Sequence, residues 1–195
     1  MTMINKEDFG TIKKNLDSFD IEREKIIKKS REIIHLSKKI IYSLHREDLN
    51  YAAKQIPNIK KEISKLKEVG LKTRGIEETG SFKVAVQEYV EAIAFFEFIK
   101  NKKLIENKQL NMNDEYYLMG ICDLTGEVVR FAVNSAAKEK YDNALLSKEF
   151  VDQIYGEMLK FDFKGGELRR KFDSIKYDLK KLEDLVYELK LKGKI

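Results

Sequence analysis

Apolar side chains recur every three or four residues along most of this chain, a spacing that places them on one face of an α-helix. The first such stretch covers residues 12–46, where Ile26, Ile33 and Ile40 follow one another at intervals of seven. A second set with the same interval lies beside them: Ile27, Ile34 and Ile41. The pattern predicts one long amphipathic helix of roughly ten turns.

The same periodicity predicts five more helices, which cover residues 47–69, 82–100, 116–138, 147–160 and 167–191. Gly70 is the expected C-cap of the second helix, and Ser81 and Ser147 are the expected N-caps of the third and fifth. Pro57 either kinks the second helix or starts its second half. Non-helical segments are expected at 71–80, at 101–113 with a short helical turn at 103–106, at 141–143 and at 161–166.

These helices indicate an all-α fold, a single-domain bundle of about six to seven helices that spans residues 1–195. The one cysteine, Cys122, excludes an internal disulfide and a Cys-rich zinc site, and its apolar neighbours indicate a small core residue. We see no signal peptide and no apolar run long enough to cross a membrane, so we expect a soluble, cytoplasmic protein. The net charge of +5 permits a polyanionic partner such as nucleic acid without requiring one.

Residues 116–138 are apolar on nearly every side, which is typical of a helix inside a protein. The exceptions are Asp123, Glu127, Arg130 and Asn134, whose intervals of four, three and four place them in one narrow stripe. Carboxylates are rarely buried without a partner, because desolvating a charge costs on the order of several kcal/mol. The stripe should therefore face a cation, a bound metal or a wet cavity.

A second acidic pair, Glu88 and Glu91, lies on the equally apolar helix over residues 82–100. If the two helices face each other, these glutamates converge with Asp123 and Glu127. Four oxygen ligands suit Mg²⁺ or Mn²⁺, which leave room for a substrate phosphate and support phosphodiester hydrolysis.

The same pattern is equally compatible with carboxylates paired with buried Arg or Lys, and Arg130 is the obvious candidate partner. A di-iron site is a weaker alternative, because no histidine lies three residues after any of the four acids.

A polar row runs beside the apolar stripe of the first helix, at intervals of four, three, four and three: Arg31, His35, Lys38, Tyr42 and His45. Each residue alone fits the solvated flank of an amphipathic helix. Together with Arg46 they form our candidate for binding nucleic acid, a row of phosphate contacts with a stacking aromatic among them.

Four sequence blocks, in this order, resemble the translin family, and within it the branch of translin-associated factor X. The blocks are REKIIKKSREIIHLSKKIIYSLHR (residues 23–46), QEYVEA (87–92), YYLMGICDLTGEVVRFAVNS (116–135) and LRRKFDSIKYDLKKLEDLVYELKLKG (168–193). The resemblance implies about seven helices and assembly into a closed, hollow oligomer, an octamer, that binds single-stranded RNA and DNA inside its shell. It also implies a Mg²⁺-dependent endoribonuclease site formed by Glu88, Glu91, Asp123 and Glu127.

The chain departs from the eukaryotic pattern in having a short N-terminus without a basic extension. We therefore expect a homo-oligomer, with a translin-like partner subunit as the other option. The leading function is a Mg²⁺- or Mn²⁺-dependent endoribonuclease that acts on single-stranded RNA. The alternatives are a non-catalytic protein that binds single-stranded RNA or DNA and a purely structural helical assembly.

Overall fold

The computed structural model describes residues 3–72 and 75–195. Within these ranges the chain forms seven α-helices, one short 3₁₀-helix and no strand, which confirms the expected all-α fold. The elements are α1 (Lys6–His45), α2 (Leu49–Lys72), η1 (Ile76–Glu78), α3 (Gly80–Asn101), α4 (Asn107–Leu110), α5 (Asp114–Ala137), α6 (Asp142–Met158) and α7 (Gly166–Leu191).

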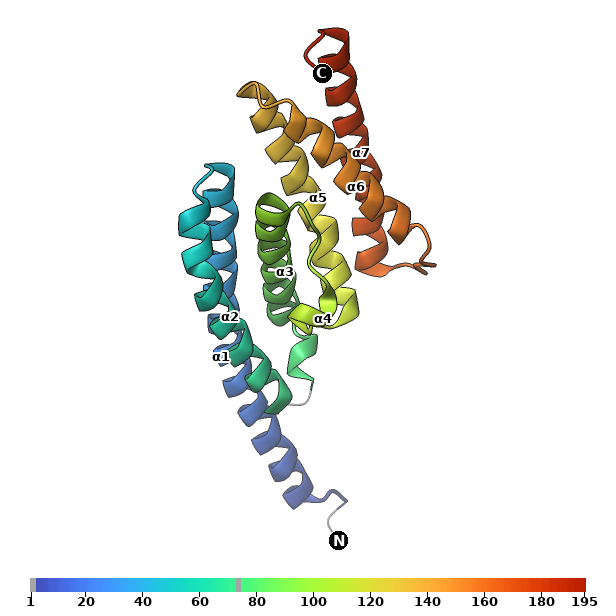
Figure 1. Ribbon diagram of the computed structural model, residues 1–195. Helices are drawn as coiled ribbons and strands as arrows, with labels where there is room; N and C mark the ends of the chain where they lie inside the picture. The colour runs from blue at the N-terminus through green and yellow to red at the C-terminus, as the bar shows by residue number, and fades with distance from the viewer. Residues whose placement is uncertain (1–2, 73–74) are drawn as a thin grey trace.

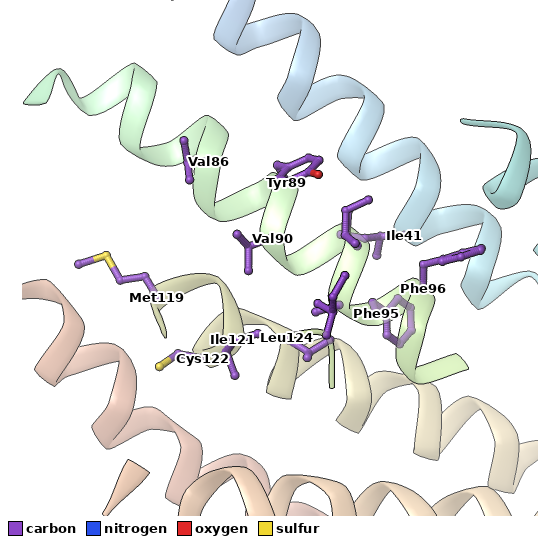
Figure 2. Packing of buried hydrophobic residues seen from close by; sticks show 14 of the residues in the cluster. Ile41, Val86, Tyr89, Val90, Phe95, Phe96, Met119, Ile121, Cys122 and Leu124 are labelled. Atoms are coloured by element: carbon purple, nitrogen blue, oxygen red, sulfur yellow. The ribbon is translucent and has the colours of Figure 1, made fainter. Parts of the chain in front are cut away.

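Two central helices, α3 and α5, separate two helical pairs (Figure 1). The pair α1 and α2 packs against α3, whereas α6 and α7 pack against α5. The core lies along the junction of α3 and α5, where Val90 and Phe95 face Ile121 and Leu124, whereas Tyr89 lies on the side of α3 nearer to α1 (Figure 2). None of the described helices is long and apolar enough to span a membrane.

Polar caps begin the two helices that carry most of the charged candidates. The Asn5 side chain accepts hydrogen bonds from the backbone N–H groups of Glu7 and Asp8, at 3.0 and 3.3 Å, and starts α1 earlier than its apolar pattern predicts. The Asn113 side chain caps α5 in the same way. The polar residues that precede the periodic pattern therefore belong to these helices.

Gly120 lets α5 approach α3 unusually closely. A Cβ atom at this position would lie 2.8 Å from the carbonyl oxygen of Gln87 and 2.8 Å from the Cβ atom of Val90. Both atoms belong to α3, one on its backbone, so neither can swing away like the end of a long side chain. The glycine therefore fixes the spacing of the two helices one turn from the acidic residues.

Several predicted ends are wrong. Gly70 is not a C-cap; it is buried within α2, where a Cβ atom would lie 3.0 Å from the ring of Phe82. Ser81 is not the N-cap of α3, because Thr79 precedes the helix. Ser147 lies fully buried inside α6, which begins at Asp142 and so replaces the turn expected at 141–143.

The connections also differ in part from the expectation. The helical turn forms at α4 and not at residues 103–106, because the Glu106 and Gln109 side chains form a capping box at its start. The expected loop at 71–80 is shorter, since α2 continues to Lys72 and residues 76–78 form η1. Residues 73–74 of that loop lie outside the described ranges. The helix α2 continues through Pro57 without a break.

We predict that Gly120→Ala destabilises the protein by about 1–3 kcal/mol, because the added methyl group overpacks the junction of α3 and α5. Gly156→Ala is the matched control: this helical glycine has open space at its Cβ position, so alanine should stabilise by about 0.5–1 kcal/mol. Urea denaturation of both variants measures the difference. Equal or greater stability of Gly120→Ala would show that the helices can separate without cost.

Candidate functional site

The packing of α3 against α5 brings three of the four acids to one cavity and places Asp123 near them, outside the cavity lining. Glu88 and Glu91 of α3 and Glu127 of α5 line one cavity of about 310 Å³. Lys38 and Tyr42 of α1 and Arg130 of α5 line the same cavity. Carboxylates, cationic side chains and an aromatic ring therefore meet in one place, formed by three helices.

Asp123 forms an ion pair with a lysine that the sequence pattern did not identify. The Lys171 ammonium on α7 donates hydrogen bonds to both carboxylate oxygens of Asp123, at 2.7 and 2.6 Å. Burial raises the pKa of Asp123, and the Lys171 contact offsets only part of that rise. The signal for this lysine is its position, three residues after the buried Leu168 and four before the buried Ile175. A lysine on the buried face of a helix needs a carboxylate partner.

Glu127 has a different partner. Its Oε2 atom contacts the His45 ring, and the Arg130 guanidinium lies 3.6 Å away. Burial pushes the pKa of Glu127 upward, but His45 and Arg130 outweigh it, so the net pKa is lowered. The expected pairing of an acid with Arg130 does occur, with His45 as the nearer partner.

Glu91 has no such partner: no cationic side chain lies within 4.0 Å of it in the described ranges. Burial raises the pKa of Glu91 to about 8, and the negative charges of Asp123, Glu88 and Glu127 add to the rise. Glu88 lies between these cases, with a cation nearby but not in close contact. Its pKa is raised by burial, although Lys38 approaches to 4.0 Å and partly offsets the effect. The charge of the cluster is therefore left uncompensated around Glu91.

The oxygen-rich donor set suits a hard divalent cation, but the side chains are not yet arranged around one. In the part of the chain that the structure describes, no three Asp, Glu, His or Cys side chains are grouped to hold a metal ion. Two of the four acids point to protein cations, Asp123 to Lys171 and Glu127 to His45. Metal binding would require both carboxylates to exchange these partners for the ion.

The polar row on α1 divides into exposed and buried members. Arg31, His35, Lys38, Tyr42 and Arg46 are exposed, whereas His45 is buried against Phe95 and Glu127. The His45 side chain therefore belongs to the acidic cluster and not to the exposed row. Asn134, the last member of the α5 stripe, is exposed to solvent.

Tyr42 lies at the edge of the cavity with 54% of its surface exposed. The guanidinium groups of Arg46 and Arg130 lie over its ring, at 5.8 and 5.2 Å from the centroid. An exposed ring flanked by cations is a surface on which a base can stack and a phosphate can bind.

A larger cavity of about 570 Å³ lies between α5 and α6, away from these acids. Its walls are mostly apolar and include a single carboxylate, Glu157. Cys122 is also buried nearby in the core, and burial raises the pKa of its thiol to about 12, which confirms its role as a small core residue. Neither feature offers the reactive groups that the acidic cavity contains.

Comparison with known proteins points to one family. A model of the translin family matches residues 21–193. Translin-associated protein X from Mus musculus is 29% identical over an alignment that covers 95% of this chain and 78% of the mouse protein. These matches confirm the resemblance seen in the four sequence blocks.

Solved structures show the same architecture. The crystal structure of apo-NeC3PO superposes with a TM-score of 0.85 at 26% identity and covers 96% of this chain and 98% of its own. The structure of an AfC3PO–duplex RNA complex superposes with a TM-score of 0.84 at 23% identity, covering 95% of this chain and 97% of its own, a likeness that shows the fold alone.

The raised pKa of Glu91 predicts a specific pH dependence of stability. With a pKa of about 8 when folded and an ordinary value of 4.5, Glu91 keeps a proton that the unfolded chain releases, so stability is lost as the pH rises between these values. The Glu91→Gln variant, which cannot ionise, should lose less stability over this interval. Thermal unfolding midpoints measured from pH 5 to pH 9 in a chelator would test this, and parallel curves for the two proteins would contradict it.

Proposed function

This chain belongs to the translin family, and on that premise we propose that it is an endoribonuclease that cleaves single-stranded RNA with the help of Mg²⁺ or Mn²⁺. Glu88, Glu91, Asp123 and Glu127 would bind the ion. Single-stranded DNA would bind to the same surface. The coarser part of this assignment, a place among RNA-processing proteins, is supported by the family and by its structural neighbours.

One observation carries the proposal: Glu91 is half-buried beside three other carboxylates, and among the described residues no cationic side chain lies within 4.0 Å of it. Burial first, and then the neighbouring carboxylates, raise the pKa of Glu91 to about 8, so a cation that enters the cavity would stabilise the ionised carboxylate. If these carboxylates only formed structural ion pairs, each acid would have a cationic partner and no negative charge would be left over. The negative charge left over at Glu91 therefore favours a site that takes up a cation from solution.

The groups around the acids suit an RNA strand. Lys38 and Arg130 line the cavity and can bind phosphate oxygens next to the acids. Tyr42 can stack a base at the rim, and the exposed residues Arg31, His35 and Arg46 extend the surface along α1. His45, which is buried, would orient Glu127 and would not contact the strand.

In the reaction these side chains would have distinct roles. Glu88, Glu91, Asp123 and Glu127 would hold a divalent ion, which would supply Lewis-acid activation of the phosphodiester and of water. Lys38 and Arg130 would hold the scissile phosphate and stabilise the charge that develops on its oxygens. His45 would keep Glu127 oriented at the cavity, and Lys171 would hold Asp123 beside it until the ion binds.

We also propose that the chain works as a hollow homo-oligomer, an octamer, or together with a translin-like partner subunit. The AfC3PO neighbour was solved with duplex RNA, so a duplex is a substrate to compare with the single strand.

A second candidate, a non-catalytic protein that binds single-stranded RNA or DNA, is favoured by a different observation. Lys171 and His45 already contact two of the four acids. If these pairs persist in solution, the site lacks the free carboxylates that a catalytic ion needs. Binding would then occur without cleavage.

We predict that the purified protein cleaves labelled single-stranded RNA with Mg²⁺ or Mn²⁺, and that EDTA abolishes cleavage. The Glu91→Gln variant should cleave at least about a hundredfold more slowly, since loss of a metal ligand removes several kcal/mol of transition-state stabilisation. Glu97→Gln on the same helix, whose side chain bonds to Asn101, is the matched control and should cleave normally. Binding without cleavage in the wild-type protein would favour the second candidate.

The exposed row predicts a salt-dependent contribution to binding. Lys38→Gln should weaken binding to all sequences and lower the slope of log K against log salt by about 0.7 for a single strand, because one phosphate contact is lost. Lys39→Gln, at the neighbouring exposed position on α1 and outside the cavity lining, should leave the slope unchanged. Filter binding at several salt concentrations measures the slopes. Equal slopes for the two variants would exclude Lys38 from the strand path.

A further inference from the structure

The first part of α1 extends beyond the rest of the bundle (Figure 1). α1 has 40 residues, whereas α2, which packs along it, has 24. Counted from the N-terminus, Ile26 is the first buried residue of α1. Residues 6–25, roughly five to six turns of the helix, therefore precede its first buried position.

This projecting segment carries an apolar stripe: Phe9, Ile12, Leu16 and Phe19, at intervals of three, four and three. The exposed fractions of Phe9, Ile12 and Leu16 are 61%, 46% and 60%, and Phe19 lies half-buried at the edge of the core. The same register continues into the core residues Ile26, Ile33 and Ile40. One stripe is thus buried along part of α1 and open to solvent along the rest.

We propose that this stripe, Phe9 to Phe19, packs antiparallel against the same stripe of a second copy of this chain. The inference deepens the oligomer part of the proposed function. The order of side chains supports an identical partner. An aromatic ring stands at each end and two aliphatic side chains stand between them, so reversing the stripe gives a similar stripe. Phe9 then faces Phe19 of the second copy, and Ile12 faces its Leu16.

The shape of the bundle selects the antiparallel orientation. Beyond residue 26, the stripe on α1 faces the helices of its own bundle. A parallel copy continuing along the stripe would run into those helices. In an antiparallel copy, the N-terminus of the second α1 instead lies near residue 23 of the first, close to where the core begins. The bundle of the second copy then lies at the opposite end of the two paired helices.

The flanking charges permit this pairing without specifying it. Lys6 of one copy would lie near Asp20 of the second copy, whereas Asp8 and Glu22 would share the other flank. These side chains are at the rim, where solvent and salt reduce both attraction and repulsion. Burial of the apolar stripe is therefore the main driving force.

Leu16→Glu tests the proposal, with Ile21→Glu as the matched control. Both residues lie on α1 and both are 60% exposed, but Ile21 is on the opposite face of the helix. We expect Leu16→Glu to lower the mass of the assembly measured by native mass spectrometry or sedimentation, and Ile21→Glu to leave it unchanged. Glutamate is a good helix former, and circular dichroism would confirm that α1 stays folded. Equal masses for wild type and Leu16→Glu would overturn the proposal.

Disulfide formation tests the orientation. Ile12→Cys chains mixed with Leu16→Cys chains should cross-link faster than either variant alone, because only the mixed pair brings the two thiols together across the antiparallel contact. The native Cys122 can remain, since it is buried. Faster cross-linking of Leu16→Cys with itself would indicate a parallel contact and overturn the proposal.

The outcomes separate this inference from the proposed nuclease. An oligomer whose mass is unaffected by Leu16→Glu contradicts the α1 contact alone. A wild-type protein that assembles through α1 but does not cleave RNA contradicts the nuclease alone. A monomeric wild type contradicts both the α1 contact and the proposed oligomer, and leaves the cleavage assay as an independent test.

Discussion

The close contact of α3 with α5 at Gly120 determines the geometry of the acidic site. Because no side chain separates the backbones there, acids on both helices face one small cavity. The surrounding core residues Phe95, Ile121 and Leu124 exclude water on the remaining sides of the junction. The fold therefore holds negative charges closer together, and in a less polar environment, than they would be on a protein surface.

The outer helices supply partners to some of these acids and not to others. Lys171 of α7 neutralises Asp123, and His45 of α1 contacts Glu127, so each side of the bundle supplies one partner. Lys38 reaches Glu88 only at 4.0 Å, and no cation in the described part of the chain lies that close to Glu91. The protein thus holds the cluster together by partial neutralisation. A divalent cation from solution would complete it, and the same cavity contains the residues that could hold an RNA phosphate.

The amino-acid sequence alone predicts the helical architecture and the shared direction of the two side chains in each acidic pair, because both follow from intervals of three and four residues. That the pairs converge is predicted only on the condition that their two helices face each other. It does not predict which cation each acid meets. Lys171 is 48 residues from Asp123, and His45 is 82 residues from Glu127, so these contacts depend on how the helices pack. Helix ends were missed for a related reason. Ser147 is a residue type that often caps a helix, but it lies in the packed interior of α6. Gly70 is a residue type that often ends a helix, but here it makes room for the ring of Phe82.

The central claim is that the four carboxylates take up a divalent ion, and calorimetric titration of Mn²⁺ into the protein at pH 7 tests it most directly. Because the pKa of Glu91 is about 8, ion binding should release protons, which is measured by repeating the titration in buffers of different ionisation enthalpy. We expect saturable binding with proton release in the wild-type protein, and loss of both in Glu91→Gln. Absence of binding at millimolar Mn²⁺, or identical titrations of the two proteins, would contradict it.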